Sequence, residues 1–312
     1  MTGTGSPSGK ALALGILSSM LFSITYLINN SMAQSGGDWM WSASLRFLLM
    51  LPVLLAAVLI RGQERQVFSE ILRAPWAWLL WSMIGFGLFY APLTFASAYG
   101  PSWLVAGTFQ FTILAGALMT PLFRGPDGRR THMPVRLLPV LAVMIAGVFL
   151  LQLDHARTVR GGKALLFALP VLLSAFAYPL GNRKTMALCQ GRLTTLQRVL
   201  AMTVCSLPLW LLFAGMALAR SGWPSGSQLA QSAVVAACSG LLATLIFFHA
   251  TALVRSRPQL LALVESTQCG EVVFSLFSGV LLLHEALPGP MGWVGLALIV
   301  GGMVCNSLLS VR

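Results

Sequence analysis

The chain has 312 residues, of which 57% are apolar and only 9% are charged, whereas about 25% of residues are charged in an ordinary soluble domain. This small number of charged side chains cannot cover the surface of a soluble protein. The composition therefore places the chain in a lipid bilayer. The net charge of +12 would suggest nucleic-acid binding in a soluble protein, but in a membrane protein basic loops mark the cytoplasmic side. We therefore expect no nucleic-acid partner.

Apolar runs of roughly 20 residues, the length that crosses a bilayer as a helix, recur along the whole chain with short gaps between them. In chain order we place these spans at 10–29, 41–60, 76–97, 102–123, 134–153, 163–182, 194–219, 228–254, 259–283 and 291–310. The sequence therefore predicts an all-α integral membrane protein with ten transmembrane helices.

The distribution of Lys and Arg predicts the orientation of these helices. If the N-terminus is inside, the inner segments hold 14 of the 20 basic residues and the outer loops hold 4, with the loop at 157–163 as the exception. The positive-inside rule then places both termini in the cytoplasm of a bacterial-type inner or plasma membrane. Residues 1–9 have no strongly basic segment, and we expect an uncleaved first span.

An internal duplication is the main organisational signal. A shift of 152 residues aligns three residue types that are uncommon at membrane depth, pairing Tyr26 with Tyr178, Asn30 with Asn182 and Arg46 with Arg198. We predict a cytoplasmic tail at 1–9, a five-helix repeat at 10–153, an outer connecting loop at 154–162 and a second five-helix repeat at 163–312. Because five is odd, the second repeat would run upside down relative to the first.

The duplicated residues predict two polar clusters. Tyr and Asn four residues apart share one face of a helix, and each Arg begins the following span. We expect Tyr26, Asn30 and Arg46 near the outer mouth, and their three equivalents near the inner mouth. Each cluster would be either a gate, in which Arg meets the substrate and Tyr closes over it, or a clamp that satisfies a buried Arg. The sequence does not choose between the two.

The span at 259–283 carries two acidic residues, Glu265 and Glu271, with Gln268 between them. An ionisable side chain at mid-depth costs about 2.5–3.5 kcal/mol on insertion scales, so such residues mark function. At 1.5 Å per residue the two acids lie about 9 Å apart along the helix, too far to share one proton. These residues share a face with Ser275, which we expect to line a cavity and to couple protons to transport. The alternative is that one Glu pairs with an Arg and holds the bundle together.

Four further residues are weaker candidates for the lining of a cavity. Thr108 aligns with Glu265 in the duplication, and Gln110 follows it in the same span. Trp103 could stack on an aromatic or cationic ligand. His249 could relay protons or be an interior histidine with its hydrogen bonds satisfied. The five cysteines are scattered and form no C-x-x-C motif, so we expect no metal, cofactor or disulfide.

Four stretches carry a resemblance to a known family: WSASLRFLLMLP at 41–52, GFGLFYAPLTFASAYGPSWLVAGT at 85–108, AFAYPLGNRK at 175–184 and VESTQCGEVVFSLFSGVLLLHEALPGPMGWVGLALIVGGM at 264–303. They resemble the drug/metabolite transporter superfamily of ten-span carriers, and within it the EamA-like and multidrug resistance efflux transporter family. The resemblance implies export of a small molecule without naming it. One departure is Glu285, which has no clear equivalent after the span at 102–123.

The sequence contains no G-x-x-x-x-G-K-[ST] loop, no H-E-x-x-H and no G-x-S-x-G, which argues against a primary pump and against common hydrolases. It predicts an alternating-access secondary transporter, not an enzyme, that exports a small cationic, zwitterionic or amphipathic metabolite or drug in exchange for protons. A uniporter or importer, a channel, and an intramembrane enzyme using Glu265, Glu271 and His249 are the alternatives. Monomer and homodimer both stay open.

Overall fold

The computed structural model describes residues 7–119, 138–158, 163–254, 260, 263–264 and 266–309. Within these residues every regular element is helical. The first half contains α1 (Pro7–Gln34), α2 (Trp39–Leu59), α3 (Glu64–Arg73), α4 (Pro75–Ser82), η1 (Met83–Leu88), α5 (Phe89–Tyr99), α6 (Ser102–Phe109), α7 (Phe111–Leu118) and α8 (Leu138–Thr158). The second half contains α9 (Lys163–Cys189), α10 (Thr195–Ser221), α11 (Gly226–Val235), η4 (Ala236–Leu242), α12 (Ala243–Val254), η5 (Thr267–Cys269), α14 (Gly270–Leu283) and α15 (Pro290–Leu309).

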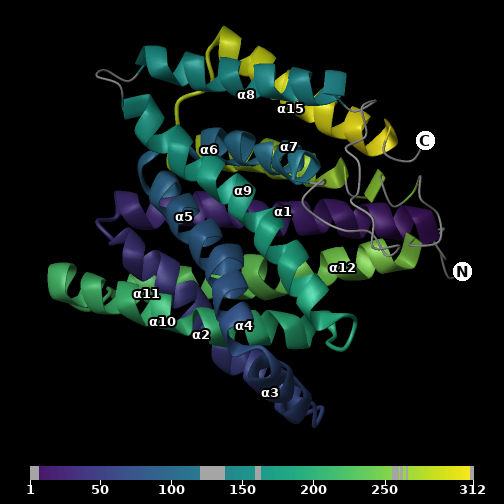
Figure 1. Cartoon of the computed structure of the whole chain (residues 1–312). Coiled ribbons are helices and arrows are strands. Elements are labelled where there is room, and N and C mark those ends of the chain that lie inside the picture. The colour runs from purple at the N-terminus through teal and green to yellow at the C-terminus, as the bar shows by residue number, and fades with distance from the viewer. Residues whose placement is uncertain are drawn as a thin grey trace, which may run out of the picture.

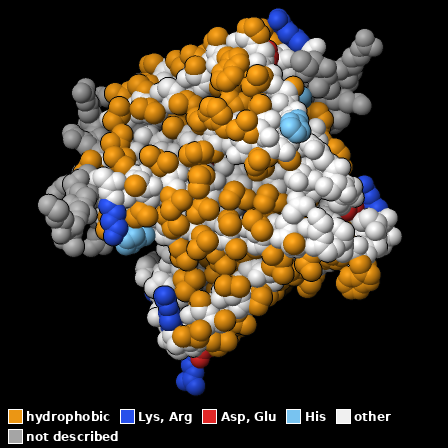
Figure 2. All heavy atoms as spheres, turned by 180° about the vertical axis from the view of Figure 1, so that it is seen from behind, with side chains coloured by type: hydrophobic (Ala, Val, Ile, Leu, Met, Phe, Trp, Pro, Cys, Tyr) orange, Lys and Arg blue, Asp and Glu red, His pale blue; other side chains and the backbone are white. Residues whose placement is uncertain are grey.

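Length and composition make six of the described helical stretches fit to cross a membrane: Gly9–Gln34, Trp39–Leu59, Pro75–Tyr99, Leu138–Arg157, Thr195–Ser221 and Gly226–Thr251. Shorter apolar helices cover Ser102–Leu118, Thr267–Leu283 and Pro290–Asn306. Large apolar side chains are exposed along these helices, and Figure 2 shows that they cover much of one face while Lys and Arg stand at its margins. This surface suits lipid and not water.

Several expected spans are interrupted, which the run-length analysis did not predict. The third and the eighth contain π-helical segments, η1 and η4, and the fourth breaks at Gln110 between α6 and α7. The ninth passes through the short 3₁₀ segment η5 before α14 begins. Both π-helical segments contain glycine, whose conformational freedom makes a regular α-helix less stable. Another unexpected element is α3, a ten-residue amphipathic helix in the loop after α2.

The helices pair mainly across the two halves of the chain. In Figure 1, α8 and α15 lie side by side at one edge, and α2 packs with α10 towards the opposite edge. Between them, α1 packs on α12 and α14, while α9 packs on α5 and α7. Each of these pairs joins one helix from the first half with one from the second. Any site in the middle of the molecule is therefore built from both halves.

Glycine allows two of these crossings to be very close. A Cβ atom on Gly295 of α15 would lie 2.7 Å from the carbonyl oxygen of Gly147 in α8. At the contact between η1 and α9, a Cβ atom on Gly181 would collide with the backbone of Gly85. Because the obstructing atoms belong to the backbone, they cannot move aside as a flexible side chain would. These glycines set how near the two halves approach each other.

Candidate functional site

Tyr26 and Glu271 form the centre of the candidate site. The Tyr26 hydroxyl donates a hydrogen bond of 3.1 Å to Glu271 Oε2. Tyr26 is buried on α1, and Glu271 is half-buried in the first turn of α14. The packing of α1 on α14 brings together two residues that are 245 positions apart. The pair places an acid and a phenol inside the helical bundle.

Arg46 of α2 adds a positive charge beside this pair. Its Nη1 donates to Thr25 Oγ1 at 3.2 Å, and its guanidinium lies over the Tyr90 ring with the Cζ atom 4.3 Å from the ring centroid. The Thr25 hydroxyl is also hydrogen-bonded to Ser239 of η4. Arg46 is buried, with 9% of its surface exposed, and its Nε finds no acceptor among the described residues. Arg46 is thus held by a hydroxyl and a ring and interacts electrostatically with Tyr26.

Tyr178 of α9 approaches the same centre from the second half. It interacts electrostatically with Glu271, Arg46 and Tyr26. Its ring centroid is 4.8 Å from that of Phe89 and 6.0 Å from that of Phe109. Phe109 belongs to the same buried apolar cluster as Tyr26, and Phe89 packs against that cluster. Tyr178 is 37% exposed, the most open ring of the three.

This arrangement corrects the expected separation of the two tyrosines to opposite mouths. The helix α1 continues past Asn30 to Gln34, so Tyr26 is about 12 Å from that end at 1.5 Å per residue. In the same way α9 continues past Asn182 to Cys189. Both tyrosines therefore lie within their helices and not at the helix ends. Tyr26 is hydrogen-bonded to Glu271, and Tyr178 interacts with Glu271 electrostatically.

Asn30 does not join Tyr26 and Arg46. Its Nδ2 donates to the carbonyl oxygens of Ser97 at 3.1 Å and Gly100 at 3.0 Å, and its Oδ1 accepts from Gln34 at 2.6 Å. The amide therefore satisfies carbonyl groups at the C-terminal end of α5, which have no partner inside their own helix. These contacts are those of a clamp between α1 and α5.

The equivalents of Asn30 and Arg46 in the second half lie around Tyr178. Asn182 forms a hydrogen bond with Tyr178, one turn away on α9. Arg198 lies in the first turn of α10 and is half-buried. It interacts electrostatically with Tyr178, and its Nε finds no acceptor in the described part of the chain. This second trio is therefore closer to a single group than the first.

Only part of the predicted acidic face on the ninth span is visible, because Glu265 lies outside the described residues. Gln268 Nε2 donates to Ser18 Oγ of α1 at 3.2 Å. Together with the bond from Tyr26 to Glu271, this shows that Gln268 and Glu271 face α1. Ser275 is buried, and its hydroxyl has no hydrogen-bond partner among the described residues. The spacing argument assumed one continuous helix, whereas η5 precedes α14.

The four weaker candidates are placed elsewhere. Thr108 is buried between the Leu104 carbonyl and the Gln152 amide, and Gln110 donates to its own helix at Ala106. Trp103 is buried, and its Nε1 donates to the Ala286 carbonyl at 3.1 Å, so its ring anchors a loop. His249 is exposed on α12. Among the described contacts, none joins these residues to Glu271.

The sequence analysis missed several residues of the site. Thr25, Ser239 and Tyr90 hold Arg46, and the Asn29 amide donates to the Tyr90 hydroxyl at 3.3 Å. A signal was present in α1, which carries an unusual number of buried small polar residues for a membrane span: Ser18, Ser19, Ser23, Thr25, Asn29 and Asn30.

The role of Glu285 is structural. Its carboxylate accepts hydrogen bonds from the Ser102 backbone N–H at 2.9 Å and from the Ser102 hydroxyl at 2.7 Å. A residue of the second half thus caps the N-terminus of α6 in the first half. Burial in this loop raises the pKa of Glu285 above its ordinary value, against the effect of these hydrogen bonds.

No group of three His, Cys, Asp or Glu side chains that could hold a metal ion occurs within the described ranges. The side chains of Glu271, Tyr26, Tyr178 and Arg46 can take part in protonation, hydrogen bonding and the binding of charge.

Comparison with known proteins identifies the family. Residues 9–312 match the family described as "EmrE: Putative multidrug resistance efflux transporter". "Uncharacterized protein YjlA" of Bacillus subtilis (strain 168) is 46% identical over 308 residues, covering 96% of this chain and 95% of that protein. A protein of Shouchella clausii, "Uncharacterized 42.1 kDa protein in intracellular alkaline protease 3'region", is 48% identical over 267 residues, covering 84% of this chain and 70% of the relative.

A solved structure described as "Crystal structure of protein" has the same fold, with a TM-score of 0.62 at 18% identity, and the match covers 96% of this chain and 97% of that one. The family match spans nearly the whole chain, and the apolar helices and lipid-facing surface agree with it. The chain is an integral membrane protein that belongs to the multidrug resistance efflux transporter family, a family of small-molecule transporters.

Proposed function

We propose that the protein is a secondary transporter that exports a small cationic or amphipathic molecule in exchange for protons, with Glu271 as the coupling group. The observation that carries this proposal is the half-buried Glu271 carboxylate, which is hydrogen-bonded to Tyr26 and interacts electrostatically with Tyr178. An acidic side chain inside a bilayer is costly, so its presence there points to a function. Glu271 faces the helical interior.

The proposal includes ten spans arranged as two inverted repeats in an inner or plasma membrane, with both termini in the cytoplasm. The helix contacts support this arrangement, because the packing of α1 on α12 and α14 has a counterpart in the packing of α9 on α5 and α7. The π-helical segments η1 and η4 also occur in corresponding spans. Two halves of similar shape and opposite direction can open the centre to each side in turn.

Exchange follows from competition at Glu271. The carboxylate can hold a proton or face a cationic substrate, but it cannot do both at once. A proton taken from outside is released when substrate arrives from inside, and the Tyr26 hydroxyl stabilises the carboxylate by donating to it. Because each ligand leaves before the other binds, the movement of one drives the movement of the other.

The surroundings of Glu271 favour a cation with apolar groups. The rings of Tyr178, Phe89 and Phe109 contact one another, and the two Phe rings pack in the cluster that contains Tyr26, the partner of Glu271. Aromatic faces attract cations. Arg46, the nearby positive charge, is already engaged by Thr25 and Tyr90. The groups that a ligand can reach are therefore the Glu271 carboxylate and the aromatic rings next to Tyr178.

The test is transport by the purified protein in liposomes with an imposed pH gradient. Wild-type protein should move a radiolabelled organic cation against its gradient and show counterflow, whereas Glu271→Gln should reduce pH-driven transport to the level of empty liposomes. Glu64→Gln on α3 neutralises a Glu outside the proposed site and should transport normally.

Glu265→Gln should be measured in parallel, because this residue is the other acid predicted in the ninth span. Full pH-driven transport by Glu271→Gln would contradict the assignment of the coupling group. Flux that neither saturates nor shows counterflow would indicate a channel instead of a carrier.

A further inference from the structure

Two hydrogen-bonded clusters hold the two ends of the α2–α10 helix pair. The first joins α3 to the turn between α9 and α10. Arg192 Nε donates to Glu70 Oε1 at 2.6 Å, and Arg192 Nη2 donates to the Leu188 carbonyl at 2.9 Å. Gln66 of α3 donates to the Arg192 carbonyl at 2.6 Å and accepts from Gln197 of α10 at 2.8 Å.

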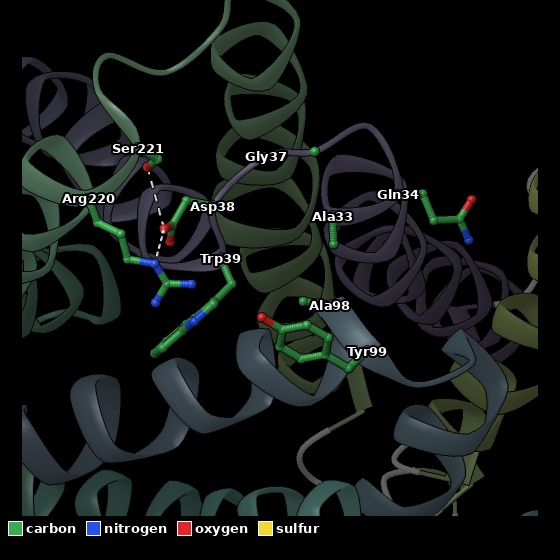
Figure 3. A pocket seen from close by; sticks show the side chains of 10 residues that line it. Ala33, Gln34, Gly37, Asp38, Trp39, Ala98, Tyr99, Arg220 and Ser221 are labelled. Atoms are coloured by element: carbon green, nitrogen blue, oxygen red, sulfur yellow. Dashed lines mark hydrogen bonds and ion pairs between the residues drawn. The ribbon is translucent and has the colours of Figure 1, made fainter. Parts of the chain in front are cut away.

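The second cluster joins the end of α10 to the turn before α2, as Figure 3 shows. Arg220 Nε is 3.7 Å from Asp38 Oδ2, and the Ser221 hydroxyl donates to the same oxygen at 3.4 Å. Gln228 of α11 donates to the Asp38 carbonyl at 2.8 Å, and Trp41 Nε1 donates to the Gly222 carbonyl at 2.9 Å.

The two clusters occupy corresponding places in the two halves. The first links α3, which follows α2, with the turn before α10. The second links the last turn of α10 and the start of α11 with the turn before α2. Asp38 and Arg192 are 154 residues apart, close to the shift that aligns Tyr26 with Tyr178. The charges are reversed between the clusters, because the turn carries the acid in one and the base in the other.

The clusters differ in strength. The bond between Arg192 and Glu70 is short and charge-assisted, and the Glu70 side chain is 11% exposed. The pair of Arg220 and Asp38 is longer, and the Arg220 side chain is 63% exposed, so water screens it. A pocket of about 390 Å³ adjoins the second cluster, whereas the pocket beside the first is about 220 Å³. The first cluster holds its helix ends more firmly.

We propose that these clusters are latches that set which face of the transporter opens: an inner latch of Glu70, Arg192 and Gln66, and an outer latch of Asp38, Arg220 and Ser221. The inference rests on the alternating access of the proposed function. The inner latch lies on the side that the basic loops mark as cytoplasmic. Because the inner latch is the stronger, the protein without substrate favours a closed inner face, and substrate export requires its release.

A native thiol reports on the inner latch. Cys189 is buried at the end of α9, next to Leu188, and its carbonyl oxygen accepts from the Arg192 backbone N–H at 2.9 Å. Release of Arg192 from Glu70 frees the turn that covers this thiol. Cys205, buried within α10, serves as an internal standard for loosening of the whole fold.

The experiment measures the alkylation rate of Cys189 by a water-soluble maleimide in the full-length protein in lipid nanodiscs, resolved by peptide mass spectrometry. Glu70→Gln should raise the Cys189 rate about fivefold or more, as expected from the loss of a charge-assisted bond. Glu64→Gln, the same change on the same helix, should leave it unchanged. Arg220→Gln should leave Cys189 as protected as in the wild type or more so, because it favours opening of the other face.

A second set of variants keeps the test decisive. Arg192→Gln should raise the rate as Glu70→Gln does, and the double variant should add little, because both changes remove one interaction. An unchanged Cys189 rate in a folded Glu70→Gln protein, with Cys205 as protected as in the wild type, would overturn the latch. So would an equal increase at Cys205 or in Glu64→Gln. The rates need no substrate, so they hold whether or not proton-driven transport is found.

Discussion

At the scale of single residues, rarity in a bilayer selects candidate residues but does not show which of them are neighbours. Glu271, Tyr26 and Arg46 stood out because such residues are costly in a bilayer, and they do lie near one another. Thr25 and Ser239 complete the site but could not be predicted from sequence, since small hydroxyl residues are common in membrane helices and usually bond to their own backbone. Only the packing of α1 against η4 distinguishes these two.

The hydrogen bond from Tyr26 to Glu271 gives the first prediction. Tyr26→Phe keeps the ring and removes the donor, so the carboxylate loses about 1.5–3 kcal/mol of stabilisation and pH-driven transport should fall about 10- to 100-fold. Initial rates in liposomes measure the effect. Tyr99→Phe, on an exposed ring at the end of α5, is the matched control and should transport at the wild-type rate. Equal rates for both variants would exclude a role for the hydroxyl.

Glu70 gives a prediction about acid. Arg192, followed by Arg73, holds the pKa of Glu70 below its ordinary value of 4.5, against the opposing effect of burial. A carboxyl group with a lowered pKa in the folded protein stabilises the fold above its ordinary pKa, and this contribution is lost as the pH falls through the lowered value. The wild type should therefore melt at a higher temperature than Glu70→Gln at neutral pH, and the gap should close only below pH 4.5. A gap that is constant down to the most acidic buffer would argue against the ion pair.

At the scale of helices, the sequence located most apolar segments but not their internal breaks. A run of apolar residues shows that a segment can cross the bilayer, but it says little about whether the helix is continuous. The π-helical segments η1 and η4 pack on α9 and α1 of the other half, and such contacts are not visible in a local pattern. For the same reason α1 and α9 extend past the Tyr and Asn motifs at which the apolar runs end.

The contact between α8 and α15 gives a prediction at this scale. Gly295→Ala would press a methyl group against the Gly147 carbonyl and the Leu151 amide, 2.7 and 2.9 Å away, and should cost about 1–3 kcal/mol of stability. Gly301→Ala on the same helix meets nothing within 4 Å and should be neutral or slightly stabilising. Thermal unfolding of the two variants in detergent compares them directly. Similar losses in both would mean that α15 does not pack on α8 through Gly295.

At the scale of the whole molecule, composition alone was enough to assign the membrane, and the family match agrees with it. The position of the site was harder to predict, because residues with equivalent sequence positions were expected at opposite ends of the protein. In the structure Tyr26 and Tyr178 both interact with Glu271, so equivalent residues from the two halves meet at one centre. The proposed transporter, with one central site and two alternating openings, would bring equivalent residues together in this way.

The central claim is that a proton and a substrate compete for Glu271, and proton release on binding tests it most directly. Purified protein in weakly buffered detergent is mixed with tetraphenylphosphonium, a cation surrounded by aromatic rings, and the pH change is recorded with a dye. The wild type should release protons in proportion to the cation bound. Glu271→Gln, which lacks the carboxylate, should bind the cation more weakly and release no protons. Binding by the wild type with no release, or equal release by both proteins, would contradict the account.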